Sequence, residues 1–135
     1  MLLIVKSFLL LLQIKFQLKK YNFNTLAKKY NLILQKDDII HKDIDIKKVK
    51  TIGWAVERSA LLLPWDGLCL VKALAAQQLL KKQNLSGTIF MGVKKDKEGK
   101  ELEAHAWLKY NDTFLTGRAG HKEFTVVSRF TWSIN

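Results

Sequence analysis

Two residues in this chain, Cys69 and His105, have the side chains and spacing needed for nucleophilic catalysis. Cys69 begins a strongly helical pattern directly after the breaker sequence Leu63–Gly67. A thiol at a helix N-terminus lies at the positive end of the helix dipole, which favours the thiolate form. His105, 36 residues later, lies in the segment Glu-Ala-His-Ala-Trp-Leu, which is typical of a buried strand. An imidazole beside the thiol would complete a nucleophile and its base, so the sequence predicts a cysteine peptidase or acyl-transfer enzyme.

The length and the cysteine count limit which folds and which cofactors are compatible with that chemistry. A chain of 135 residues suits one domain with a single core, here a basic helical part (1–48) followed by a catalytic core (49–135). One cysteine excludes an internal disulfide, and a metal site would have to rely on three scattered histidines. We therefore expect no metal and no cofactor, and a reducing, cytoplasmic setting.

The positive charge is concentrated at the start of the chain. The formal net charge is +11, and residues 1–36 contain seven lysines and no acid. The basic and aromatic signatures of nucleic-acid binding modules are missing, so no nucleic-acid partner is expected. The remaining anionic partners are a protein surface and a membrane.

The apolar N-terminal stretch leaves two interpretations open. Lys6 interrupts it, the uninterrupted apolar run is only Phe8–Leu12, and no small-residue cleavage site follows. It is too short to span a bilayer and lacks the order of a signal peptide. It is therefore either a core or partner-facing helix, or a basic helix lying peripherally on the inner face of an anionic membrane.

Hydrophobic periodicity predicts helices in the first part of the chain and a sheet in the last third. The expected helices are 2–20, 25–30 with Asn24 as N-cap, 48–63, and one that starts at Cys69. The expected strands are 88–93, 102–110, 113–116 and 123–129. This order predicts an α+β fold in which N-terminal helices precede a Cys-headed central helix packed on a small antiparallel sheet.

The other two histidines and the four tryptophans are expected to have structural rather than catalytic roles. His41 and His121 stand in polar stretches and are expected to be solvated. The four tryptophans are expected in the core or in a pocket wall rather than at a cofactor; they are Trp54, Trp65, Trp107 and Trp132.

Several segments, taken together in their order, resemble a known family. They are Trp54-Ala-Val-Glu-Arg, Leu62-Leu-Pro-Trp, Cys69-Leu-Val-Lys-Ala-Leu-Ala-Ala-Gln-Gln-Leu-Leu, Gly92-Val-Lys-Lys and Ala104-His-Ala-Trp-Leu. Their order and spacing over residues 50 to 130 are similar to the transglutaminase-like branch of the papain-type fold, and within it to the leader peptidases of lasso-peptide biosynthesis.

The resemblance implies proteolysis of a ribosomally made precursor peptide. Cys69 would attack the carbonyl at the leader–core junction, and His105 would act as base and then as acid. The partners implied are the leader of the precursor, a separate leader-recognition protein, and a cyclase that closes a macrolactam on the freed core.

The third catalytic member of the family is an aspartate on the strand after the histidine, and this chain departs from the pattern. A two-residue turn at Asn111–Asp112 pairs Tyr110 with Thr113 and brings His105 opposite Gly117–Arg118, where no acid exists.

Other groups are available to orient the imidazole. Asp112 lies about 20 Å along the strand from His105. Glu103 shares the face of His105 and is the candidate orienting residue, while Thr116, a backbone carbonyl and Asp66 are alternatives. The missing aspartate is also consistent with a second function, a non-catalytic peptide- or protein-binding module on the same fold.

Overall fold

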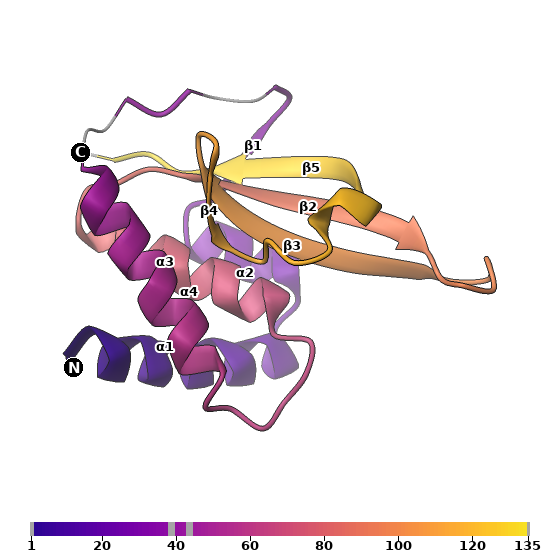
Figure 1. Cartoon of the computed structure of the whole chain (residues 1–135), viewed down its shortest axis with the longest axis horizontal. Helices are drawn as coiled ribbons and strands as arrows, with labels where there is room; N and C mark the ends of the chain where they lie inside the picture. Colours follow the sequence, from indigo (N-terminus) through magenta and orange to yellow (C-terminus); the bar gives the residue numbers. More distant parts are fainter. Residues whose placement is uncertain (1, 38–39, 43–44, 135) are drawn as a thin grey trace.

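The computed structural model describes residues 2–37, 40–42 and 45–134, and Figure 1 shows how its elements are arranged. Within these ranges the helices are α1 (Leu2–Lys20), α2 (Phe23–Lys29), α3 (Ile46–Ala60) and α4 (Cys69–Lys82). The strands are β1 (Ile33–Gln35), β2 (Thr88–Lys95), β3 (Leu102–Tyr110), β4 (Thr113–Thr116) and β5 (Thr125–Thr131). A single 3-10 turn, His121–Glu123, precedes β5.

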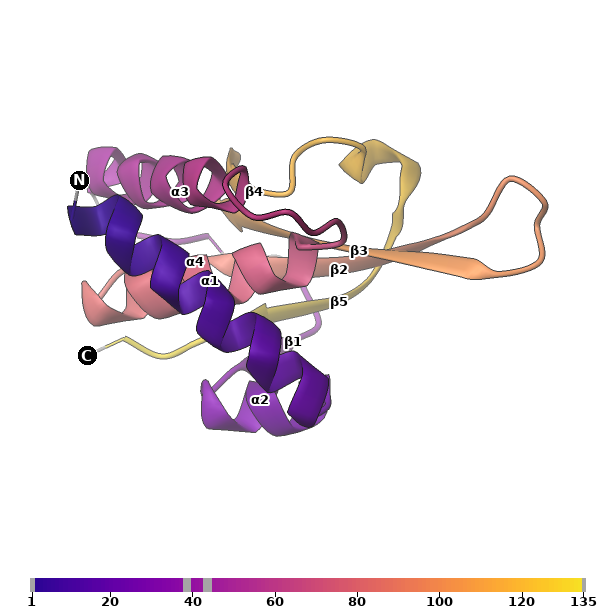
Figure 2. The ribbon, with the colours of Figure 1, turned by 90° about the horizontal axis from the view of Figure 1, so that it is seen from below.

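The strands form one antiparallel sheet with the order β1-β5-β2-β3-β4. Seen from below in Figure 2, α1, α3 and α4 lie in front of the sheet and cover a single face of it. The predicted α+β fold is confirmed, with the Cys-headed helix packed on a small antiparallel sheet.

The helix that starts at Cys69 is the central element of the core. Eight of its 14 residues are buried, and they lie on all sides of the helix. A helix that is apolar all round has to be enclosed by other elements, and α4 contacts α1, α3, β3 and β4. Its N-terminus is consequently held in a fixed place under the sheet.

Alternation along β3 divides its side chains between the two faces of the sheet. Ala106, Leu108 and Tyr110 belong to the core shared with the helices. Side chains of successive strand residues point to opposite faces, so His105 and Trp107 lie on the face away from α4.

The local boundaries differ from the predicted ones for identifiable reasons. The helix expected to end at Leu63, with its start at Lys48 or near Ile46, is α3. It starts at Ile46, where the carboxylate of Asp45 accepts from the N–H of Lys48 at 3.1 Å, and it ends at Ala60, three residues earlier than expected. The helix expected at 25–30 is α2, which is capped by Asn22 rather than by Asn24.

The sheet also extends further than predicted. The last strand runs to Thr131 instead of Arg129, and its C-terminal half pairs with β1, which was not predicted. The exposed connection expected at 35–48 includes residues 38–39 and 43–44, which lie outside the described residues.

The prediction that His41 is solvated is wrong. The residue is only 8% exposed, its Nε2 lies 2.7 Å from the hydroxyl oxygen of Thr88, and its ring stacks on Tyr110. Its backbone N–H also donates to the side chain of Asn111. His41 therefore fastens its segment to the end of the sheet.

The expectation for the tryptophans holds for two of the four. Trp107 and Trp132 are buried, whereas Trp54 and Trp65 are 60% and 38% exposed.

None of the helices in the described part of the chain is long and apolar enough to cross a membrane.

A glycine lets α3 approach the edge of the sheet. A Cβ on Gly53 would lie 2.9 Å from the carbonyl oxygen and 3.0 Å from the Cα of Leu115 in β4. Both are backbone atoms and cannot rotate away, so the close packing of α3 on β4 requires glycine at this position.

We expect Gly53→Ala to destabilise the protein, although alanine is the better helix former by about 1 kcal/mol. Overpacking against backbone costs about 1–3 kcal/mol and should prevail. The midpoint of urea unfolding measures the effect, with the exposed Lys50→Ala in the same helix as the matched control. A Gly53→Ala midpoint equal to or above that of the parent protein would show that α3 and β4 can separate freely.

Candidate active site

Cys69 is the first residue of α4 and carries a free thiol. Its side chain is half-buried and packs against the apolar core. The residue before it, Leu68, makes no side-chain capping hydrogen bond to the N–H groups of the first turn. Such uncapped N–H groups, together with the helix dipole, favour a negative charge at this end of α4.

The ring of His105 is held by a backbone carbonyl. Nε2 lies 2.7 Å from the oxygen of Gly117, and the ring centre lies 5.5 Å from that of Trp107 and 5.1 Å from that of Phe124. A carbonyl oxygen can only accept, so the neutral imidazole carries its proton on Nε2. Nδ1 is then the basic nitrogen.

The structure does not bring the two predicted catalytic side chains into contact. The thiol of Cys69 packs on the helix side of the sheet, and the ring of His105 projects with Trp107 to the other side. Among the described residues, no hydrogen bond joins them. The ring does lie next to an open edge. β4 pairs only with Leu108–Tyr110, Gly117 packs against Ala106 and Trp107, and no described strand pairs with the residues of β3 before His105 on that edge.

A chain of polar contacts connects the two sides of the sheet across this edge. Lys72, one turn beyond Cys69, places its amine 2.6 Å from one carboxylate oxygen of Glu57. The other oxygen of Glu57 accepts from the N–H of Gly117 at 3.1 Å, and the carbonyl of Gly117 holds His105. The first turn of α4 and the imidazole are therefore tied to the same backbone unit.

The candidate orienting residue, Glu103, points elsewhere. Its carboxylate lies 3.5 Å from the amine of Lys94 and makes no hydrogen bond to His105. Asp66 and Asp112 are exposed, and the hydroxyl of Thr116 is buried without a hydrogen-bond partner in the described residues. The backbone carbonyl, one of the alternatives left open by the sequence, occupies the orienting position.

The turn that leads into β5 encloses the other side of the imidazole. Phe124 packs against His105, and the ammonium of Lys94 lies 4.8 Å from the centre of the Phe124 ring. The hydrogen bond from Lys94 to Glu123 is the main reason why the pKa of the Lys94 amine is raised above its ordinary value. An open depression of about 620 Å³ lies next to this region, lined by Glu57 and residues 118–122.

His121 is partly buried rather than fully solvated. Its Nδ1 lies 2.7 Å from the carbonyl oxygen of Arg118, and its ring packs on Phe114 and Trp107. Within the ranges that the structure describes, no three His, Cys, Asp or Glu side chains gather as a metal site.

Two groups that shape this site, Glu57 and the carbonyl of Gly117, were not predicted from the sequence. Glu57 stands in the Trp54–Arg58 segment, but a charged residue on an amphipathic helix normally indicates only its solvated face. The carbonyl of Gly117 belongs to the backbone and has no residue signature. The available signal was that the predicted hairpin places a glycine, and no acid, opposite His105.

Two glycines in the same loop allow a controlled test of the Gly117 carbonyl. Gly117 and Gly120 have φ values of +73° and +77°, and a Cβ on either is disfavoured by roughly 1–2 kcal/mol. On Gly117 this Cβ would also lie 2.5 Å from the carbonyl oxygen of Ala106, whereas on Gly120 it meets nothing closer than 3.8 Å.

We therefore expect Gly117→Ala to be the more destabilising change, by a further 1–3 kcal/mol or so, and to move the ring resonances of His105. Gly120→Ala should leave those resonances in place. Urea unfolding and NMR spectra of the imidazole measure the two effects. Equal destabilisation with unmoved His105 signals in both variants would contradict the role of Gly117.

Comparison with known proteins places this arrangement in a family. The profile described as the transglutaminase-like superfamily matches residues 9–129. A search of curated proteins and a search of solved structures found no match.

Proposed function

Because the chain belongs to the transglutaminase-like superfamily, we propose that it is a cysteine peptidase that removes the leader from a ribosomally made lasso-peptide precursor. The observation that carries the proposal is the position of Cys69. Its thiol stands at the uncapped N-terminus of a buried helix, in a family that includes cysteine peptidase-like members. The helix N–H groups are placed to donate to the oxyanion that forms when the sulfur attacks.

The proposed reaction proceeds through an acyl-enzyme. Nδ1 of His105 takes the thiol proton, and the sulfur of Cys69 forms a bond to the carbonyl carbon at the leader–core junction. The C–N bond then breaks, and the protonated imidazole gives its proton to the leaving amine of the core. Water, deprotonated by the same imidazole, hydrolyses the thioester and releases the leader.

This reaction requires a rearrangement at the open edge of β3. Cys69 and His105 can meet only if the imidazole turns around that edge, which involves the segment Gly117–Gly120. The two glycines give this segment backbone freedom that other residues lack. Catalytic hydrogen bonds are commonly formed only when substrate is bound, and an extended peptide lying along the uncovered edge is the natural trigger.

The proposal includes two further proteins. A separate leader-recognition protein would present the precursor, and a cyclase would close the macrolactam on the freed core amine. The lysine-rich and acid-free residues 1–36 support an anionic docking partner.

Cleavage of the precursor tests the nucleophile and the base. Cys69→Ala and His105→Ala should each lower the rate by several orders of magnitude, because the two groups act as a unit. His121→Ala, which removes a neighbouring imidazole, is the matched control and should keep most of the activity. Undiminished cleavage by Cys69→Ala would refute the peptidase mechanism.

Alkylation of the thiol by iodoacetamide tests the pair without a precursor. If His105 reaches Cys69 in solution, His105→Ala should slow alkylation at neutral pH severalfold, and His121→Ala should not. Identical rates in the parent and in His105→Ala would mean that the two side chains do not interact.

The orienting role of the carbonyl predicts mild effects for nearby acids. Glu103→Gln and Asp112→Asn should each change the cleavage rate by less than about threefold, since neither carboxylate contacts the imidazole. Steady-state rates measured on the same precursor provide the comparison. A large loss in either variant would show that the ring changes partner during the reaction.

The second candidate function is a non-catalytic module that binds a peptide or a protein. The observation that favours it is the separation of thiol and imidazole by the sheet, together with a backbone carbonyl, that of Gly117, in place of a carboxylate on the imidazole. Precursor that is bound equally by the parent and by Cys69→Ala, and that is cleaved by neither even with the leader-recognition protein present, would establish this function instead.

A further inference from the structure

The outer face of α1 carries a regular apolar stripe that no other described helix or strand covers, and of its members only Leu12 is half-buried. Its members are spaced alternately by three and four residues, and we call them the α1 seam: Leu2, Val5, Leu9, Leu12 and Phe16. Leu2, Leu9 and Phe16 are 68%, 59% and 58% exposed, although the opposite face of the helix is buried. Burying such side chains against a partner would release a large apolar surface from water.

The spacing of the seam specifies the shape of what covers it. A 3-4-3-4 repeat places the side chains at the a and d positions of a heptad, and this narrow stripe is the one used for packing against another helix. The seam from Leu2 to Phe16 is about 21 Å long. A partner helix therefore needs at least four turns to cover it.

The flanks of the seam specify the charge of the partner. The positions beside the seam are occupied by Lys6, Gln13 and Lys20 on one side and by Phe8 and Lys15 on the other. Two copies of this chain would bring lysines against lysines in either orientation, which disfavours self-association. Glutamate or aspartate at the facing positions would instead form ion pairs with Lys6, Lys15 and Lys20.

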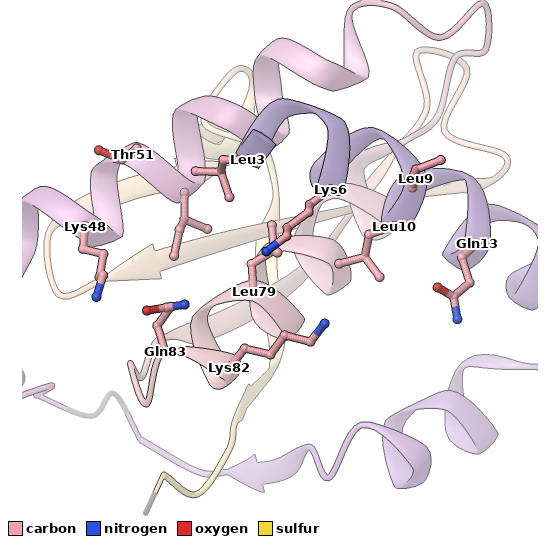
Figure 3. A pocket seen from close by; sticks show the side chains of 11 residues that line it. Leu3, Lys6, Leu9, Leu10, Gln13, Lys48, Thr51, Leu79, Lys82 and Gln83 are labelled. Atoms are coloured by element: carbon pink, nitrogen blue, oxygen red, sulfur yellow. The ribbon is translucent and has the colours of Figure 1, made fainter. Parts of the chain in front are cut away.

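A pocket beside the seam adds a second, independent indication of the same partner. It has a volume of about 380 Å³ and lies between α1, α3 and α4, with an apolar floor that includes Leu3, Leu10 and Leu79. Figure 3 shows the amines of Lys6, Lys48 and Lys82 around this hollow; we call these three residues the lysine rim. Among the described residues, none of the three forms an ion pair.

We propose that the α1 seam and the lysine rim bind an acidic amphipathic helix of another protein. The apolar side of that helix packs on the seam, one of its apolar side chains enters the pocket, and its carboxylates face the lysine rim. An anionic membrane is the less suitable occupant, because lysines border the seam closely on both sides, whereas membrane-surface helices present a broad apolar face. The proposal does not depend on peptidase activity.

Binding of two designed peptides to the full chain tests the proposal. Both are three-heptad helices with leucine at a and d; one has glutamate at e and g, and the other has lysine there. The glutamate peptide should bind, and more weakly as salt is raised, because exposed charges are screened within about 10 Å at 0.1 M. The lysine peptide should not bind. Fluorescence anisotropy of labelled peptide gives both affinities.

Variants locate the site on the chain. Lys6→Glu should lower the affinity for the glutamate peptide about fivefold, and this variant should bind the lysine peptide. Lys97→Glu, an exposed change of equal charge in the turn after β2, should do neither. Val5→Asp, in the seam, should abolish binding. Leu102→Asp, at a site that is 67% exposed on the sheet, should leave binding unchanged. Circular dichroism confirms that each variant is folded.

Four outcomes would overturn the proposal. They are equal binding of the two peptides, an unchanged affinity in Lys6→Glu, a chain dimer in sedimentation that Val5→Asp abolishes, and binding to phosphatidylserine vesicles without binding to either peptide. The last two would assign the seam to a second copy or to a membrane surface.

Discussion

The carboxylate of Glu57 holds together the parts of the molecule that define the candidate active site. One oxygen pairs with Lys72 of α4 at 2.6 Å, and the other accepts the N–H of Gly117 at 3.1 Å. Gly117 in turn orients His105 through its carbonyl. This bridge exists only because α3 lies against β4. That close contact is possible because residue 53 is a glycine and has no side chain. A change in helix packing is therefore transmitted to the imidazole.

The parts of the fold that could be predicted are those determined by local sequence. The turn at Asn111–Asp112 has φ of +51° at Asn111 and pairs Tyr110 with Thr113 as expected. The breaker run separates α3 from α4, although α3 already ends at Ala60, and the alanine-rich pattern after Cys69 specifies the next helix. In these segments each residue's preference agrees with its neighbours', so sequence alone suffices.

The features that could not be predicted depend on distant or backbone contacts. β1 is three residues long and pairs with β5, almost one hundred residues away, so no local sequence pattern predicts it. His41 lies in a polar stretch yet is buried by contacts with Thr88 and Tyr110. The side of the sheet to which His105 points depends on β3 register relative to the helices, which the Glu-Ala-His-Ala-Trp-Leu segment does not specify. Hydrophobic spacing shows that a strand is buried, but here both of its faces are apolar.

Cys69 and the pocket of the proposed docking surface lie at opposite ends of α4. Cys69 opens the helix, whereas Leu79 and Lys82, near its end, line the pocket beside the seam. Thirteen helical steps separate Cys69 from Lys82, a distance of about 20 Å. An extended peptide covers this span with roughly six residues. A side chain bound in the pocket would thus lie about this far from the thiol, and a substrate tethered at the pocket end of the docked helix would need a linker of this length to reach the sulfur. The rigid, buried α4 would then fix the distance between binding and cleavage.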